Sequence, residues 1–181
     1  MNDEFIADLT NSKFYQMLFG GKDVVMIYIA GSRLYNVLDE RSDYDIVVLV
    51  NGDSEHNSNE FLMYKGRKVH WYWRNVETLI KEKNTYSIWC YGSVLFGYIS
   101  DDCIIYKNEK YADQINFLLS HKHEIALKGA EEFYKNQERL VEEICRKSRI
   151  DENNYTKFLG HLCVTSYYVL NEPIDASVVL P

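Results

Sequence analysis

The sequence predicts an α/β (α+β) fold in which a small mixed β-sheet precedes a helical C-terminal region. Two strongly apolar runs, residues 24–30 and 46–50, have the length and composition of buried strands. Two further extended segments, residues 60–64 and 68–73, surround a Lys-Gly-Arg turn and predict a β-hairpin. Across residues 110–148, Glu, Lys and apolar residues recur at helical spacing, which predicts one long helix or two broken helices.

The remaining elements follow from hydrophobic periodicity and from the residues that end helices. Gly20-Gly21 ends one amphipathic pattern, and Pro173 ends another. In chain order, we expect helices at residues 3–19, 32–37, 76–81, 86–98 and 155–170, and a short strand or extended piece at residues 103–106.

The character of the chain changes at residue 110, where the mixed pattern gives way to a helical one. We therefore expect one domain at residues 1–109 and a helical region at residues 110–181. The last residues, 176–181, are mostly apolar and stop abruptly, which is typical of an element that continues in a longer natural chain.

Composition excludes several classes of protein. The 181 residues carry a net charge of −7, which argues against an extended nucleic-acid surface. The N-terminus is acidic and lacks the basic start of a signal peptide, and no apolar run approaches the ~20 residues that span a bilayer. The four cysteines are scattered without a CxxC motif, as in reduced proteins. We expect a cytoplasmic protein without a membrane partner.

The most informative motif lies between the two apolar runs. A Gly31-Ser32 turn leaves the first predicted strand, and Asp43 and Asp45 open the second. Side chains at i and i+2 of a strand project to the same face, so the two carboxylates lie side by side while Tyr44 points away. Carboxylates at such short range repel each other. A hard divalent cation, Mg²⁺ or Mn²⁺, is the expected partner.

A simpler interpretation makes Ser42 and Asp43 turn residues that hydrogen-bond to their own backbone. A second Gly-Ser pair in the chain shows what a chance occurrence of the motif looks like. Gly92-Ser93 also lies among apolar residues and is followed by Asp101-Asp102. Those carboxylates are adjacent, so a strand would place them on opposite faces. Only the segment at residues 31–45 combines the turn, the same-face pair and both flanking strands.

Gly31-Ser32, ten residues and then Asp43-x-Asp45 resembles the GSx10DxD signature of the DNA polymerase β-like nucleotidyltransferase superfamily. The segment looks most like the small bacterial and phage members, which include the minimal nucleotidyltransferase antitoxins. The resemblance implies that Gly31 and Ser32 hold a nucleoside triphosphate, that Asp43 and Asp45 bind Mg²⁺, and that a third carboxylate on a later strand completes the site.

The residues themselves agree with a phosphate site at the turn. Gly31 lets the backbone approach a phosphate without a Cβ in the way, and Ser32 offers a hydroxyl donor. Arg33 and Arg41 are candidates for the phosphate side as well, because guanidinium groups pair with phosphate.

The third acidic ligand is the point at which the sequence departs from the family pattern. Placing that pattern on residues 68–75 puts His70 where an aspartate is expected. Three interpretations remain open. His70 is a substitute ligand or general base; or it marks a chain that binds nucleotide but turns it over poorly; or it is an ordinary strand residue, with the third acid elsewhere, for example Glu60.

The expected function is metal-dependent transfer of a nucleoside monophosphate, AMP from ATP, to an unidentified acceptor. A small molecule, a protein hydroxyl and an RNA end are all compatible with the sequence. Two alternatives remain: a catalytically weak or inactive nucleotide-binding module that acts as an antitoxin-like partner protein, and an α/β protein in which the motif arose by chance.

Overall fold

The computed structural model describes residues 4–35, 43–52, 59–80 and 94–135. Its contacts divide the chain into two compact units. The first comprises residues 1–81 and 98–121, and the second comprises residues 82–97 and 122–181. The division at residue 110 that the sequence suggests remains a prediction.

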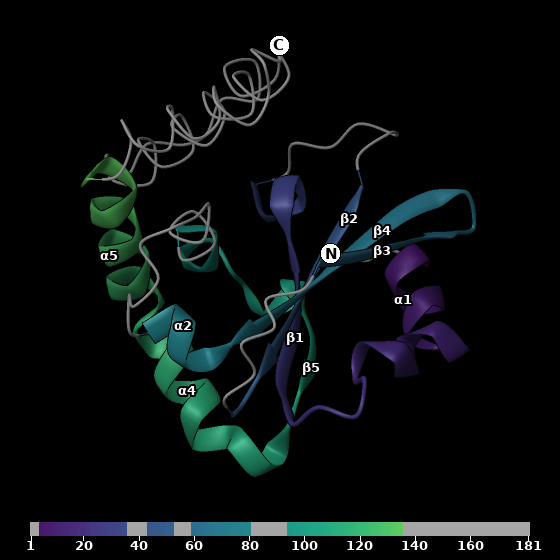
Figure 1. Cartoon of the computed structure of the whole chain (residues 1–181), viewed down its shortest axis with the longest axis horizontal. Coiled ribbons are helices and arrows are strands. Elements are labelled where there is room, and N and C mark those ends of the chain that lie inside the picture. Colours follow the sequence, from purple (N-terminus) through teal and green to yellow (C-terminus); the bar gives the residue numbers. More distant parts are fainter. Residues whose placement is uncertain (1–3, 36–42, 53–58, 81–93, 136–181) are drawn as a thin grey trace. The chain divides into compact units, whose positions relative to one another are not determined.

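A five-stranded mixed sheet forms the centre of the first unit (Figure 1). The order across the sheet is β3-β4-β2-β1-β5. β2 and β4 are parallel, and the other neighbours are antiparallel. The sheet confirms the predicted α/β (α+β) class and all five predicted strands, which are β1 (Val24–Ala30), β2 (Tyr44–Val50), β3 (Asn59–Tyr64), β4 (Arg67–Asn75) and β5 (Ile104–Lys107).

Helical segments are present where the sequence predicts helices at residues 3–19, 32–37 and 76–81, with breaks that the pattern does not reveal. The helix expected at residues 3–19 divides at residues 10–12, where the Thr10, Asn11 and Ser12 side chains hydrogen-bond to the carbonyl groups of Ala7 and Leu9. The described helices are α1 (Glu4–Thr10), α2 (Val76–Ile80), α4 (Ala112–Ser120), α5 (Lys122–Lys135) and the 3-10 helices η1 (Lys13–Leu18), η2 (Gly31–Tyr35), η3 (Asp101–Cys103) and η4 (Glu109–Tyr111).

Of the predicted helix at residues 86–98, the structure describes a helical segment at residues 94–97, and the helix predicted at residues 155–170 lies outside the described residues. The predicted helical stretch from residue 110 is broken at His121, between α4 and α5. In α5 the buried residues Ile125, Ala126, Ala130 and Phe133 share one face of the helix. No helix within the described ranges is long and apolar enough to cross a membrane.

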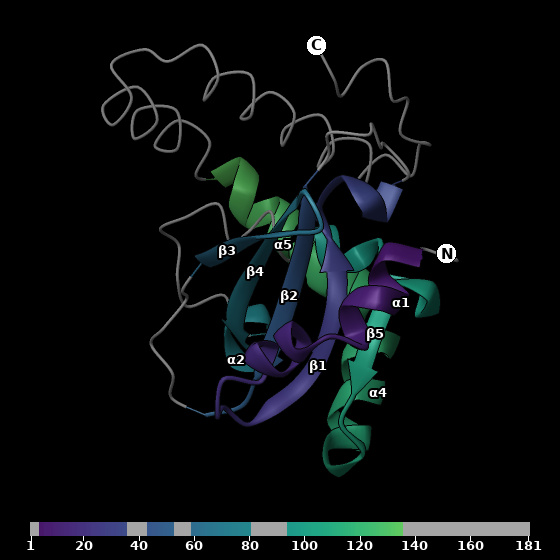
Figure 2. The same cartoon turned by 90° about the vertical axis from the view of Figure 1, so that its right-hand side faces the viewer.

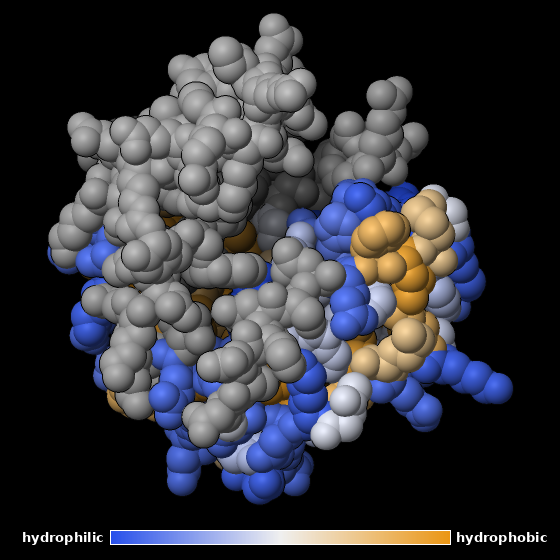
Figure 3. Space-filling view, in the orientation of Figure 1, coloured by the Kyte–Doolittle hydropathy of each residue, from blue (hydrophilic) through white to orange (hydrophobic). Residues whose placement is uncertain are grey.

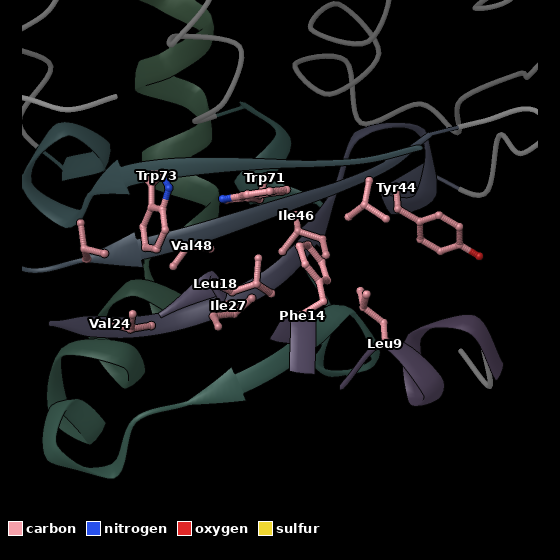
Figure 4. Packing of buried hydrophobic residues seen from close by; sticks show 12 residues of the cluster. Leu9, Phe14, Leu18, Val24, Ile27, Tyr44, Ile46, Val48, Trp71 and Trp73 are labelled. Atoms are coloured by element: carbon pink, nitrogen blue, oxygen red, sulfur yellow. The ribbon is translucent and has the colours of Figure 1, made fainter. Parts of the chain in front are cut away.

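The two faces of the sheet differ in character because strand side chains alternate. Figure 2 shows α1 and η1 in front of the sheet, and Figure 4 shows the side chains that fill the space between them. Trp71 and Trp73 of β4 point into this core, so Lys68, His70 and Tyr72 point to the other face. The core cluster consists of Leu9, Phe14, Leu18, Val24, Ile27, Tyr44, Ile46, Val48, Val50, Val69, Trp71 and Trp73.

The β3–β4 hairpin turns on Lys65 and Gly66, both of which have positive φ angles of 47° and 77°. This two-residue turn pairs Tyr64 with Arg67 and fixes the register of the whole hairpin. The Tyr64 hydroxyl and the Lys65 ammonium both bind Asp8, which ties the hairpin to α1. Apolar side chains remain at the surface where α1 and the hairpin lie (Figure 3).

Candidate functional site

The Gly31 turn and the Asp45 side chain are in direct contact. β1 ends at Ala30, which pairs with Asp45 at the start of β2. Gly31 follows with a φ of +69°, and a Cβ on this residue would overlap the Asp45 carboxylate. Glycine is therefore required here for two reasons, because its backbone angle is unfavourable for other residues and because the carboxylate occupies the space of a side chain.

Asp43 and Asp45 project to one face of the sheet, as the spacing predicts. The Asp43 side chain is 39% exposed and that of Asp45 is 25% exposed. Burial raises the pKa of the Asp45 carboxyl, and the negative charge of Asp43 acts in the same direction. Two carboxylates on one face at the start of a strand repel each other, which is the arrangement that a shared cation relieves.

His70 lies beside Asp45, because β2 and β4 are parallel and the two residues are in register. Its Nδ1 atom is 3.8 Å from Oδ1 of Asp45. The Tyr72 hydroxyl donates a hydrogen bond of 2.8 Å to the same oxygen and lies 3.3 Å from Nδ1 of His70. The Tyr72 hydrogen bond therefore orients the carboxylate, with the His70 ring beside it. Burial together with the Asp45 charge raises the pKa of Tyr72.

Lys68 is a third β4 residue on this face. Its Nζ atom is 3.8 Å from Oδ2 of Asp43. Sequence reasoning did not identify Lys68 or Tyr72, although a signal existed. Polar residues at positions 68, 70 and 72 alternate with apolar ones along a predicted strand, which places all three on the face of His70.

The structure does not bring Arg33 to the carboxylates. The Arg33 side chain is buried, and its Cζ atom lies 3.4 Å from the centroid of the Tyr44 ring. Tyr44 belongs to the core cluster on the face opposite Asp45 (Figure 4). Ser32 lies in η2, but its side chain is outside the described part of the chain, and so is the whole of Arg41.

Glu60 is also on the wrong face for a third acid. The hairpin register pairs Glu60 with Trp71, which points into the core face, whereas Phe61 pairs with His70. Opposite residues of an antiparallel pair share a face. Glu60 therefore projects away from Asp43 and Asp45, whereas His70 lies on their face, beside Asp45.

The donor set fits a hard divalent cation. Asp43 and Asp45 offer carboxylate oxygens on one face, which is the chemistry that Mg²⁺ prefers. Among the residues that the structure describes, no group of three His, Cys, Asp or Glu side chains is arranged as a metal site. Mg²⁺ commonly keeps several waters and binds through one or two carboxylates plus substrate phosphates, so two carboxylates are sufficient.

The partly buried Asp45 carboxyl predicts a specific pH dependence of stability. The pKa of Asp45 is higher in the folded protein than in the unfolded chain. At pH values between these two pKa values, the carboxyl is protonated to a greater extent in the folded protein. Stability from this group is complete below about pH 4 and is lost as the pH rises through the folded pKa. Urea unfolding in EDTA across this pH range measures the free energy of unfolding of the wild type and of Asp45→Asn. This free energy should fall less steeply with rising pH in the variant. Parallel curves would contradict the assignment.

Comparison with known proteins adds a weak structural likeness. No protein-family model matches the sequence, and no match was found among curated proteins. A solved nucleotidyltransferase-like protein from Exiguobacterium sibiricum 255-15 gives a TM-score of 0.41 at 11% identity, over 94% of this chain and 60% of that chain. The chain thus spans less than two thirds of that protein's length.

Proposed function

We propose that this chain is a metal-dependent nucleotidyltransferase that moves AMP from ATP to a hydroxyl acceptor in the cytoplasm. The supporting observation is that Asp43 and Asp45 project together beside the Gly31 turn, at the end of the sheet where β1 ends and β2 begins. Paired carboxylates beside a glycine turn are suited to a phosphate chain carrying a cation.

In this proposal each described residue has one task. Gly31 leaves room for the Asp45 carboxylate beside the turn that would face the triphosphate. Asp43 and Asp45 would hold Mg²⁺, which when bound would stabilise charge at the α-phosphoryl group. Lys68, which contacts Asp43, lies where it can neutralise a phosphate oxygen. The acceptor oxygen forms a bond to the α-phosphorus, and the bond to the departing pyrophosphate breaks.

The proton of the attacking hydroxyl also needs an acceptor. His70 is in register with Asp45, and a neutral imidazole can act as a general base. Tyr72 positions both groups, because its hydroxyl lies within hydrogen-bond distance of Asp45 and of His70. We therefore assign Tyr72 as a positioning residue and His70 as the proton acceptor.

The experiment is transfer of radiolabel from α-labelled ATP in the presence of Mg²⁺, with hydroxyl compounds, co-purifying proteins and RNA ends as acceptors. Label is expected to enter one acceptor class and to be lost when Mg²⁺ is chelated. Label transfer that persists in EDTA, or in the Asp43→Asn/Asp45→Asn double variant, would contradict the proposed function.

A second candidate is a nucleotide-binding partner protein with little turnover. The observation that favours it is the position of His70, which adjoins Asp45 where the family pattern expects a carboxylate, while Glu60 faces away. Calorimetry distinguishes the two candidates. Binding of ATP with Mg²⁺, in a protein that transfers no label to any acceptor class, would favour the binding module.

A further inference from the structure

Two large apolar side chains are exposed on the carboxylate face of the sheet. Phe61 and Met63 of β3 are 65% and 63% exposed. Their register partners are His70 and Lys68, so both project to the face that carries Asp43 and Asp45. β3 is an edge strand, where exposed apolar residues promote unwanted association unless they serve a purpose.

Charged and aromatic groups connect Phe61 to the carboxylates. The Nζ atom of Lys68 lies 5.1 Å from the Phe61 ring centroid and 3.8 Å from Oδ2 of Asp43. The His70 ring centroid is 5.7 Å from that of Phe61, and Nδ1 of His70 is 3.8 Å from Oδ1 of Asp45. The Lys68 ammonium and the His70 imidazole thus lie between the exposed Phe61 ring and the carboxylate pair.

The spacing matches an extended nucleotide. Phe61 and Asp45 are two strands apart, about 9.5 Å at the usual strand separation. A phosphate chain at Asp43 and Asp45 therefore leaves the sugar over β4 and the base over β3. The flat face of a base is apolar and stacks on an exposed aromatic ring. The phosphates would lie at the Mg²⁺ site formed by the two aspartates.

We propose that the base of the nucleoside triphosphate stacks on Phe61 and that Met63 extends this apolar surface. This inference rests on the proposed function. Stacking tolerates any base because each has a π-face, so the site selects nucleotides over inorganic polyphosphate without strong preference among bases.

The test compares two ligands, Mg²⁺·ATP and Mg²⁺·tripolyphosphate, by calorimetry on the full chain. Phe61→Ala is expected to weaken ATP binding roughly 5- to 150-fold, the range for loss of one base–aromatic stack, and to leave tripolyphosphate binding unchanged. GTP binding should fall by a similar factor. Phe61→Trp should keep the affinity for ATP and gain tryptophan fluorescence that ATP quenches, relative to the wild type.

Phe117→Ala is the matched control. Phe117 is also an exposed phenylalanine, 47% exposed on α4, and its ring stacks on His121 at 4.2 Å. This variant should bind both ligands as the wild type does.

Several results would overturn the inference. Equal ATP affinity in Phe61→Ala and wild type would do so, as would an equal loss of ATP and tripolyphosphate binding. A change of oligomeric state with unaltered ATP binding would instead identify the surface as an interface between copies. A wild-type protein that binds neither ligand with Mg²⁺ refutes the proposed function itself, and the base platform with it.

Discussion

Replacing Asp45 by asparagine is expected to weaken Mg²⁺-dependent ATP binding at least about 100-fold and to abolish label transfer. Loss of groups that merely orient a metal ligand already lowers affinity about 10- to 100-fold, so loss of the ligand's charge should have at least the larger effect. Asparagine has the same shape and can still accept the Tyr72 hydrogen bond of 2.8 Å. The change therefore removes charge and leaves packing intact. Calorimetry of Mg²⁺·ATP binding, with label transfer in parallel, measures the effect.

Asp101→Asn is the control for this substitution. Asp101 belongs to the adjacent Asp101-Asp102 pair, its side chain is 88% exposed, and it pairs with Lys107 on the surface. The Asp101→Asn variant should bind Mg²⁺·ATP as the wild type does, because an exposed ion pair contributes little to the free energy of unfolding. Unchanged Mg²⁺·ATP affinity in Asp45→Asn would show that the carboxylate pair does not hold the cation.

Gly31→Ala is expected to reduce both stability and Mg²⁺·ATP binding. An alanine at a φ of +69° is unfavourable by about 1–2 kcal/mol. Its Cβ would also overlap the Asp45 carboxylate, and forced repacking of this kind typically adds about 1–3 kcal/mol. Relief of the overlap has to displace Asp45, so the affinity for Mg²⁺·ATP should fall together with the free energy of unfolding. Urea unfolding and calorimetry on one preparation measure both quantities.

Gly21→Ala separates the two contributions. Gly21 has the same φ of +69°, but no atom lies within 4 Å of a Cβ built there. The Gly21→Ala variant should lose only the stability that corresponds to placing alanine at a positive φ, and it should bind Mg²⁺·ATP as the wild type does. Equal losses of stability in the two variants, with equal affinities for Mg²⁺·ATP, would mean that the contact between Gly31 and Asp45 has no functional consequence.

Local patterns were sufficient to predict the strands and the carboxylate pair. The apolar runs that became β1 and β2 are long enough to be buried wherever the rest of the chain lies. The side chains of Asp43 and Asp45 share a face because of strand geometry alone. The hairpin followed from the turn residues Lys65 and Gly66, although its exact pairing did not.

Pairing across strands decided the rest of the site. A two-residue turn, rather than the three-residue loop that the sequence suggested, places Phe61 opposite His70 and Glu60 opposite Trp71. A register shift of one residue would exchange these faces. Similarly, the 3-10 turn after β1 directs Arg33 over the Tyr44 ring, a position that the sequence does not reveal.

The sequence by itself therefore determined that two acids lie together after a glycine turn, because the spacing of residues along one strand fixes the faces of their side chains. Only the tertiary structure decided which neighbours they have. His70, Lys68 and Tyr72 reach Asp43 and Asp45 because β4 lies parallel to β2 in one particular register. That register depends on packing of the whole sheet against α1 and η1, which no short segment encodes.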